Sequence, residues 1–256
     1  MQLEGGSVLI TGAGSGIGEA LAIEGARRRM HVALMGRRAE ALEATLAKLA
    51  GGPHLALPGD VTEARDRLSA LDAISGRWGT LMVLVNNAGL VPAGPLAAAT
   101  DEELKATINT NLFAPMAMAR DAVPLLERYR PGRIVNIGSV LGEIPYPLFA
   151  AYSATKGGLR AFSQSLRREL APTGIGVTHA VLRATQTPAA DALGPIRARF
   201  NMSFDSPGAV ATRVWDAVER DADCVYPAGP ERFFELVQRM APRLVDRSII
   251  RQLTRA

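Results

Sequence analysis

The sequence contains little cysteine and little histidine: one cysteine, Cys224, and three histidines in 256 residues. A single thiol cannot form an internal disulfide, and these residues do not cluster with the spacing of metal ligands. A disulfide scaffold is therefore excluded, no metal site is predicted, and a reducing, cytoplasmic setting is expected. His31, His54 and His179 fall in or beside predicted strands, where structural roles are more frequent than catalytic ones.

Long apolar runs and a strong charge of one sign are also missing. No stretch approaches the roughly 20 apolar residues that cross a bilayer. The first residues lack the basic patch and apolar run of a secretory signal, so none is expected. The net charge is +4, of which +3 lies in residues 231–256, where six arginines face three acidic residues. The rest of the chain is almost neutral, which argues against a nucleic-acid-binding domain.

The chain alternates short apolar runs with longer segments of helical periodicity. Apolar runs separated by helices predict βαβ units and a parallel sheet. We therefore expect an α/β fold: a doubly wound, Rossmann-like sheet of seven parallel strands with helices on both faces. Strands are expected at 7–11, 31–36, 54–58, 81–86, 133–138, 176–182 and 224–226, and helices at about 16–29, 38–50, 63–77, 101–129, 151–171 and 207–220.

Two segments depart from this alternation. Residues 187–206 form a long connection of the kind that often serves as a lid or binding loop. Residues 230–256 repeat arginine at every fourth position with apolar residues on another side, and Pro242 interrupts the pattern. We interpret 1–229 as a single dinucleotide-binding catalytic domain and 230–256 as a basic amphipathic tail. The tail can pack on its own domain, form a contact between protomers, or bind an anionic membrane surface or an acidic partner.

A glycine-rich turn stands between the first expected strand and the first expected helix. Its glycines allow a sharp bend and a close approach to a pyrophosphate, whose charge the helix N-terminus stabilises. A tight strand–helix turn without a ligand is the simpler alternative, but the position after the first strand favours dinucleotide binding. The predicted contacts are Gly12, Ser15, Gly16, Ile17 and Gly18.

The end of the second expected strand lacks an acidic residue. A carboxylate there would bind both ribose hydroxyls of NAD and repel a 2′-phosphate. The chain has Arg37 and Arg38 instead, and guanidinium groups suit phosphate. A solvated helix start is the alternative, although positive charge is unfavourable at that end of the helix dipole. NADP(H) is therefore predicted over NAD(H).

Three polar residues are candidates for catalysis. Tyr152 and Lys156 are four residues apart, so they share one face of a helix. Ser139 follows the fifth expected strand, and ligands of α/β sheets bind at the carboxyl ends of strands. Each residue alone has a plain structural explanation. Their combination with the glycine turn is specific.

With these pieces in this order, the chain resembles the short-chain dehydrogenase/reductase family over about residues 5–229. The matching pieces are the turn at 11–18, Asp60 with Val61, the Asn-Asn-Ala-Gly run at 86–89, Asn111, Ser139, Tyr152 and Lys156. The resemblance implies hydride transfer between a nicotinamide cofactor and a carbonyl/alcohol pair of a small-molecule substrate. It also implies a homo-oligomer, either a dimer or a tetramer.

The resemblance assigns further residues to the site. Asp60 and Val61 would hold the adenine ring, Asn87, Ala88 and Gly89 would line the cofactor groove, and Asn111 would complete the catalytic set. The backbone of Thr185 and the side chain of Thr187 would bind the carboxamide, and Lys156 would reach the nicotinamide ribose. Where the family usually has Pro-Gly after the sixth strand, this chain has Leu182 and Arg183. Arg183 is therefore a candidate to face the substrate or a cofactor phosphate.

The implied roles agree with elementary chemistry. A phenol with a pKa near 10 is a poor base at neutral pH, and the charges of Lys156 and oxidised nicotinamide would lower that pKa. Tyr152 would then give a proton to the carbonyl oxygen in reduction and take it back in oxidation. Ser139 would donate a hydrogen bond to the same oxygen. Pro115 has no N–H for the carbonyl of Asn111, so that carbonyl could hold a water of a proton relay; a helix kink without catalytic purpose is the alternative.

The expected substrate pocket is mostly apolar. Its walls are residues 140–150, 90–94 and the lid, with Glu143 as the polar exception and Arg197 and Arg199 on the lid. A hydrophobic ketone or acyl-type substrate is favoured. The competing hypotheses are a catalytically silent cofactor-binding regulator or scaffold, which would not need the four polar residues, and an epimerase or dehydratase, which usually has a larger C-terminal part.

Overall fold

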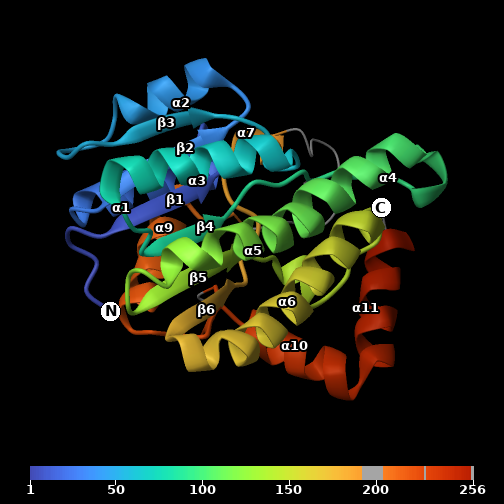
Figure 1. Ribbon diagram of the computed structural model, residues 1–256. Helices are drawn as coiled ribbons and strands as arrows, with labels where there is room; N and C mark the ends of the chain where they lie inside the picture. Colours follow the sequence, from blue (N-terminus) through green and yellow to red (C-terminus); the bar gives the residue numbers. More distant parts are fainter. Residues whose placement is uncertain (192–203, 228, 255–256) are drawn as a thin grey trace.

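The structure, a computed structural model, describes residues 1–191, 204–227 and 229–254. Seven parallel strands form one sheet in the order β3-β2-β1-β4-β5-β6-β7 (Figure 1), which confirms the predicted fold class. The strands are β1 (Ser7–Thr11), β2 (His31–Gly36), β3 (Leu55–Pro58), β4 (Val83–Asn86), β5 (Gly132–Ile137), β6 (Ile175–Ala180) and β7 (Cys224–Val225).

Helices cover both faces of the sheet. Apolar residues of α1, α2 and α9 form one buried layer, and those of α3, α5 and α6 form the other. Within the described ranges, no helix combines the length and the apolar character needed to cross a bilayer. The helices are α1 (Gly16–Arg27), α2 (Ala39–Leu46), α3 (Ala64–Trp78), α4 (Asp101–Ile108), α5 (Ala114–Leu126), α6 (Ala150–Leu170), α7 (Pro188–Asp191), α9 (Pro207–Glu219), α10 (Glu231–Met240) and α11 (Pro242–Thr254).

The helix predicted at about 101–129 is present from Asp101 to Leu126, but it is not α-helical throughout. Two α-helices, α4 and α5, are joined there by a π-helical turn, η2 (Asn109–Phe113), in which the Ala114 N–H donates to the Asn109 carbonyl. Pro115 has no N–H to donate to the carbonyl four residues earlier, so one bond of the regular α-helical pattern is missing at this point. Of the predicted lid, α7 and the segment from residue 204 onward are described, whereas 192–203 lie outside the described residues.

The central strands are buried on both faces, as expected of a parallel sheet between two helical layers, whereas the edge strands β3 and β7 are partly exposed. Every residue of β1, β4 and β5 is buried. Because all strands run in one direction, their carboxyl ends meet at one edge of the sheet. Thr11, Asn86 and Ile137 therefore end neighbouring strands at the same edge.

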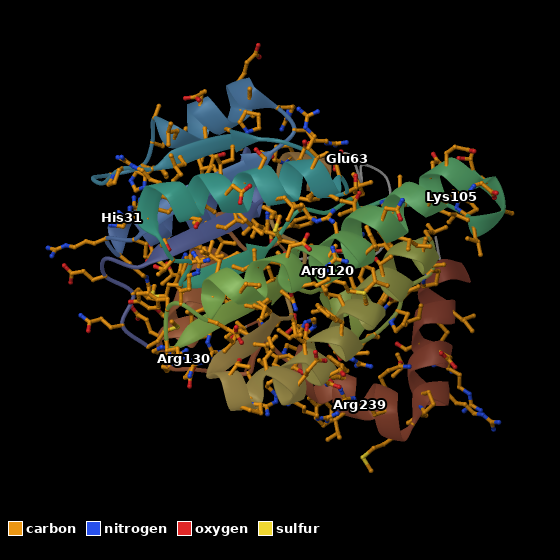
Figure 2. All side chains as sticks on the ribbon, in the orientation of Figure 1. His31, Glu63, Lys105, Arg120, Arg130 and Arg239 are labelled. Atoms are coloured by element: carbon orange, nitrogen blue, oxygen red, sulfur yellow. The ribbon has the colours of Figure 1, made fainter. Side chains whose placement is uncertain are left out.

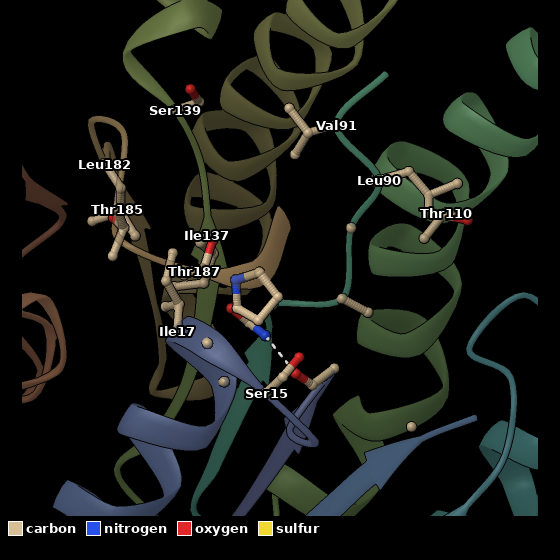
Figure 3. Close-up of a pocket in the computed structure, with 18 of the residues that line it drawn as sticks. Ser15, Ile17, Leu90, Val91, Thr110, Ile137, Ser139, Leu182, Thr185 and Thr187 are labelled. Atoms are coloured by element: carbon tan, nitrogen blue, oxygen red, sulfur yellow. Dashed lines mark hydrogen bonds between the residues drawn. The ribbon is translucent and has the colours of Figure 1, made fainter. Parts of the chain in front are cut away.

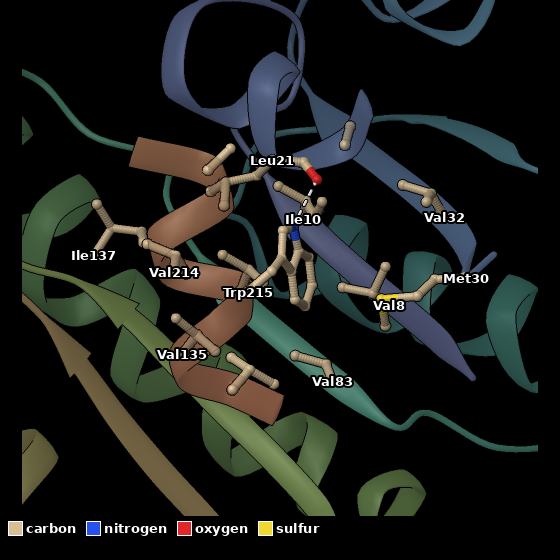
Figure 4. Packing of buried hydrophobic residues seen from close by; sticks show 14 of the residues in the cluster. Val8, Ile10, Leu21, Met30, Val32, Val83, Val135, Ile137, Val214 and Trp215 are labelled. Atoms are coloured by element: carbon tan, nitrogen blue, oxygen red, sulfur yellow. Dashed lines mark hydrogen bonds between the residues drawn. The ribbon is translucent and has the colours of Figure 1, made fainter. Parts of the chain in front are cut away.

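Trp215 of α9 is the centre of one helical layer. Its indole is fully buried among Val8, Ile10 and other apolar side chains, and its Nε1 donates to the Leu21 carbonyl at 2.9 Å (Figure 4). An added Cβ on Gly25 would lie 3.3 Å from the indole, so α1 approaches it closely. Trp215 thereby fixes α1, which carries the glycine turn, against the sheet.

We expect Trp215→Ala to lower the free energy of unfolding by about 3–5 kcal/mol, because it removes a fully buried aromatic side chain and leaves a cavity. Urea denaturation measures this. Leu68→Ala is the matched control, since Leu68 is 51% exposed, and it should change stability by about 0.5 kcal/mol or less. Equal losses in the two variants would show that α9 does not fix the layer.

Candidate active site

A cavity of about 410 Å³ lies at the carboxyl ends of the strands. Figure 3 shows Ser15 and Ile17 at the start of α1, with Leu182, Thr185 and Thr187 on one side and Leu90, Val91 and Thr110 on the other. Every residue that the sequence predicted to bind cofactor lines this cavity: Gly12, Ser15, Gly16, Ile17, Gly18, Arg37, Arg38, Asp60, Val61, Asn87, Ala88, Gly89, Tyr152, Lys156, Thr185 and Thr187.

The glycine turn needs glycine for steric reasons. Gly12 and Gly16 have φ of +66° and +60°, a region that side chains other than glycine rarely adopt. A Cβ on Gly18 would lie 2.2 Å from the Gly12 carbonyl oxygen, and a Cβ on Gly12 would lie 2.8 Å from Ala88 Cα. The Ser15 side chain makes no capping hydrogen bond at the start of α1. The first N–H groups of that helix thus border a cavity without side chains in the way, which fits a pyrophosphate.

Thr11 and Asn87 hold the turn against the end of β4. Thr11 Oγ1 accepts from the backbone N–H groups of Asn87 and Ala88 at 3.0 and 3.1 Å. The Asn87 side-chain amide donates to the carbonyls of Thr11 and Gly12 at 2.9 and 3.1 Å. Asn87 therefore fixes the backbone of the cofactor groove, which is a structural role that its position in the motif alone did not specify.

The far end of the cavity carries positive charge. Arg37 and Arg38 are exposed at the start of α2 and line the cavity. Asp60 lies nearby, but its carboxylate accepts from the Thr62 N–H and hydroxyl at 2.9 and 2.8 Å. The two guanidinium groups are thus the charged side chains of the β2 end that reach this part of the cavity.

Ser139, Tyr152 and Lys156 meet at the opposite end. The two α6 side chains are buried, and Lys156 Nζ lies 5.7 Å from the centre of the Tyr152 ring. The Lys156 ammonium donates to the Ile137 carbonyl at 2.8 Å, which ties α6 to the end of β5. Ser139 is placed to donate a hydrogen bond to the Tyr152 hydroxyl, which lowers the pKa of the tyrosine, and Ser139 Oγ accepts from the Leu141 N–H at 3.1 Å. The predicted trio therefore forms one connected group.

The ionisation of this group differs from the expectation. Burial raises the pKa of Tyr152, and the hydrogen bond from Ser139 lowers it only in part. Burial also lowers the pKa of Lys156 to about 8. Desolvation outweighs the effect of the chain's own charges, so the lowered tyrosine pKa expected from the sequence is not a property of the protein alone.

Asn111 is fully buried in the π-helical turn and does not line the cavity. Its side chain clamps Leu90: Oδ1 accepts from the Leu90 N–H and Nδ2 donates to the Leu90 carbonyl, both at 2.8 Å. Nδ2 also lies 3.3 Å from the Thr155 hydroxyl on α6. Asn111 thus joins the turn, the cavity wall and α6. The relay through its backbone carbonyl stays a prediction.

Arg183, the candidate to face the substrate or a cofactor phosphate, also makes ion pairs within the protein. Although Arg183 borders the cavity, its guanidinium pairs with Asp205 at 3.3 Å and with Glu231 at 3.4 Å. The two carboxylates attract the Arg183 guanidinium and hold it beside them. The Leu182 carbonyl accepts from the Val140 N–H at 2.9 Å, a bond that a proline at this position would also make.

The wall beside Tyr152 is apolar, as expected. Leu90, Val91, Val140, Leu141 and Phe149 line it.

Glu143, the expected polar exception, is instead buried away from this cavity in an ion pair with Arg160. The lid arginines Arg197 and Arg199 lie outside the described residues. Thr110 and Ile137 also line the cavity, although the sequence did not predict them. Their positions beside Asn111 and at the end of the fifth strand were the available signals.

The sequence matches known proteins along most of its length. The 3-oxoacyl-[acyl-carrier-protein] reductase of Escherichia coli is 38% identical over 180 residues, which cover 69% of this chain and 72% of that protein. Across five curated relatives, the matched segments cover 62–76% of the relatives' own lengths.

Solved structures are also similar. A 3-ketoacyl-(acyl-carrier-protein) reductase from Brucella melitensis, complexed with NADH, superposes with a TM-score of 0.82 at 26% identity, covering 88% of this chain and 97% of that one. A short-chain dehydrogenase from Burkholderia cenocepacia, in complex with NADP, gives 0.77 at 31% identity, covering 85% and 92%. The family model of the short-chain dehydrogenases matches residues 7–197. The chain therefore belongs to the short-chain dehydrogenase/reductase family of oxidoreductases.

Proposed function

We propose that the protein transfers a hydride between NADP(H) and a carbonyl/secondary alcohol pair, with Tyr152 as general acid and base. The observation that carries this proposal is the connected group of Ser139, Tyr152 and Lys156 at one end of a cavity that begins at a glycine turn. The cofactor, when bound, supplies or accepts the hydride. The chain's own residues must then hold the carbonyl and move one proton.

Each residue has a role that follows from its contacts. In reduction, Tyr152 donates its proton to the substrate oxygen, and in oxidation it takes that proton back. Because burial keeps Tyr152 protonated at neutral pH, the phenol is ready to act as an acid. Ser139 already donates to the phenol oxygen and can donate to a substrate oxygen in the same place as negative charge develops there.

Lys156 and Asn111 position and support this pair. The Lys156 ammonium, held at the Ile137 carbonyl, lies 5.7 Å from the centre of the Tyr152 ring, and a positive charge this near stabilises a phenolate. A Cβ on Gly89 would lie 3.3 Å from Asn111 Oδ1 and 3.9 Å from Lys156 Nζ, so a glycine at this position leaves room between the two. We propose that protons reach Lys156 from the region of Asn111.

The substrate that we propose is a hydrophobic ketone or an acyl-type compound. The apolar wall supports this choice, since burial of apolar substrate surface is favourable. The similarity to 3-oxoacyl-[acyl-carrier-protein] reductases supports a 3-oxoacyl group within that class. Nicotinamide absorbance with a panel of ketones and 3-oxoacyl thioesters of increasing chain length tests it, and a preference for short, charged carbonyl compounds would contradict it.

Tyr152→Phe should lower kcat by about 10²- to 10⁴-fold, because the variant keeps the ring but has no proton to give. The affinity for NADPH, measured by fluorescence titration, should stay unchanged. Tyr129→Phe is the matched control, since Tyr129 lies beyond the C-terminal end of α5 and packs on the core before β5. If Tyr152→Phe retains the kcat of the wild type, Tyr152 is not the proton donor.

For the cofactor, we propose that Arg37 and Arg38 bind the 2′-phosphate of NADP(H). The double change Arg37→Ala, Arg38→Ala should weaken NADPH binding by about tenfold or more, because a hydrogen bond to a charged group contributes roughly 1.5–3 kcal/mol. NADH binding should change little. Arg65→Ala with Arg77→Ala, two exposed arginines of α3, should leave both affinities unchanged. An equal loss for the two cofactors would exclude recognition of the phosphate.

A further inference from the structure

Helix α10 is amphipathic, but its apolar side faces outward and its acidic side faces the protein. Its acidic residues and Gln238 face the protein: Glu235 is buried, and Glu231 and Gln238 are half-buried. Its two arginines, Arg232 and Arg239, are exposed. Its apolar residues face outward, with Phe233 64% and Met240 79% exposed. A helix that packs on a protein core normally has the opposite arrangement. The outward apolar face thus belongs to a contact that the described chain does not itself make.

Ion pairs hold α10 in this orientation. Glu231 at its start pairs with Arg183 at 3.4 Å. Glu235 pairs with Arg239, and Arg239 lies 3.7 Å from the buried carboxylate of Glu143. Turning the helix to bury its apolar side would break the contacts that Glu231 and Arg239 make with Arg183 and Glu143 in the body of the protein. The outward direction of the apolar residues is therefore fixed by the body of the protein.

Helix α11 adds positive charge beside the apolar face. It buries Ile249 against the rest of the chain and exposes Leu244 and Ile250. The exposed Arg243, Arg247 and Arg251 are four residues apart, so they form one row along the helix. Figure 1 shows α10 and α11 at the lower right edge, outside the layers that cover the sheet, and Figure 2 labels Arg239 at the same edge.

We define the tail surface as the exposed apolar and basic residues of α10 and α11. Its apolar members are Phe233, Phe234, Leu236, Met240, Leu244 and Ile250. Its basic members are Arg232, Arg243, Arg247 and Arg251. A cluster of exposed large apolar side chains marks an interaction site.

We propose that the tail surface docks on an anionic membrane. Interfacial helices place aromatic and aliphatic side chains at the boundary of headgroups and acyl chains, while arginines beside them bind lipid phosphates. The acyl chains complement the apolar side chains of the tail surface, and the lipid phosphates complement its arginines. The acidic residues of α10 are turned toward the protein, and α11 has three described arginines against one exposed aspartate, Asp246. The side that meets the lipid is therefore cationic.

A second copy of the chain is a poorer complement. A twofold contact through the tail surface would cover the apolar residues, but it would also bring the arginine rows of the two copies together. Like charges at such a contact repel each other. An acidic protein would satisfy the arginines and leave large apolar side chains such as Phe233 and Met240 without an apolar partner. The anionic bilayer satisfies both groups.

Flotation of the full chain with vesicles tests the proposal. We expect binding to phosphatidylcholine vesicles that contain phosphatidylglycerol, much weaker binding to phosphatidylcholine alone, and loss of binding at high salt, since salt screens exposed charges. The basic variant Arg243→Gln, Arg247→Gln, Arg251→Gln should bind the anionic vesicles with an affinity at least about tenfold lower. Each arginine near an anionic membrane surface contributes favourable electrostatic energy to binding. The apolar variant Phe233→Ser, Phe234→Ser, Met240→Ser should lose a similar amount.

The matched controls carry the same kinds of change elsewhere. Arg77→Gln, Arg168→Gln, Arg220→Gln alters three exposed arginines outside the tail, and Leu68→Ser, Leu96→Ser alters two exposed leucines. Both should bind vesicles like the wild type. All variants are compared for NADPH affinity and circular dichroism, which shows that they are folded.

Three outcomes would overturn the proposal. The wild type could fail to float with anionic vesicles, or the controls could lose as much binding as the tail variants. Alternatively, the wild type could be a larger oligomer that the apolar variant dissociates, with no vesicle binding in either form, which would assign the tail surface to a second copy. Turnover is not needed for any of these readings, so the result is independent of the proposed reaction.

Discussion

Parallel pairing of all seven strands is the constraint on which the rest of the structure depends. It brings the carboxyl ends of β1, β4 and β5 to one edge of the sheet, and the residues that follow those ends form the cavity. The hydrogen bond from Lys156 to the Ile137 carbonyl then fixes α6 to the same edge. The glycine turn, the apolar wall and the tyrosine therefore face one space although they are far apart in the sequence.

Much of this arrangement follows from local sequence patterns. Buried parallel strands are continuous apolar runs, so periodicity located the strands to within about two residues of their observed bounds. Residues placed just after strand ends were predicted to line one cavity, and they do, from Gly12 to Thr187. The steric need for glycine was likewise predictable from the sequence. A glycine-rich segment directly after the first strand indicates a sharp turn into the first helix.

What the sequence did not reveal depends on distant partners. Arg183 was expected near a ligand, but its partners Asp205 and Glu231 lie 22 and 48 residues further along the chain. Glu143 was assigned to the substrate wall, whereas Arg160 holds it on the other side of the loop. Pro115 indicated an irregularity in the long helix. The π-helical turn found there, between α4 and α5, is not predicted by hydrophobic periodicity alone.

The tail illustrates the same limit in another way. Its basic, amphipathic character was plain from the spacing of the arginines, but the direction of each face was not. Glu231 of α10 reaches back to Arg183, and Arg239 reaches Glu143, so the helix contacts the protein through charge and leaves its apolar side outward. The contacts of α10 thus run to two loops that follow β5 and β6.

The central claim, that the protein transfers a hydride to a carbonyl carbon, is tested most directly with NADPH in which both hydrogens of the reactive nicotinamide carbon are replaced by deuterium. Incubation with a hydrophobic ketone or a 3-oxoacyl thioester, followed by mass spectrometry and NMR of the product, locates the label. The account predicts one deuterium on the newly formed carbinol carbon and a proton from water on its oxygen. A protein that binds the cofactor and the substrate but transfers no deuterium to the substrate carbon would contradict it.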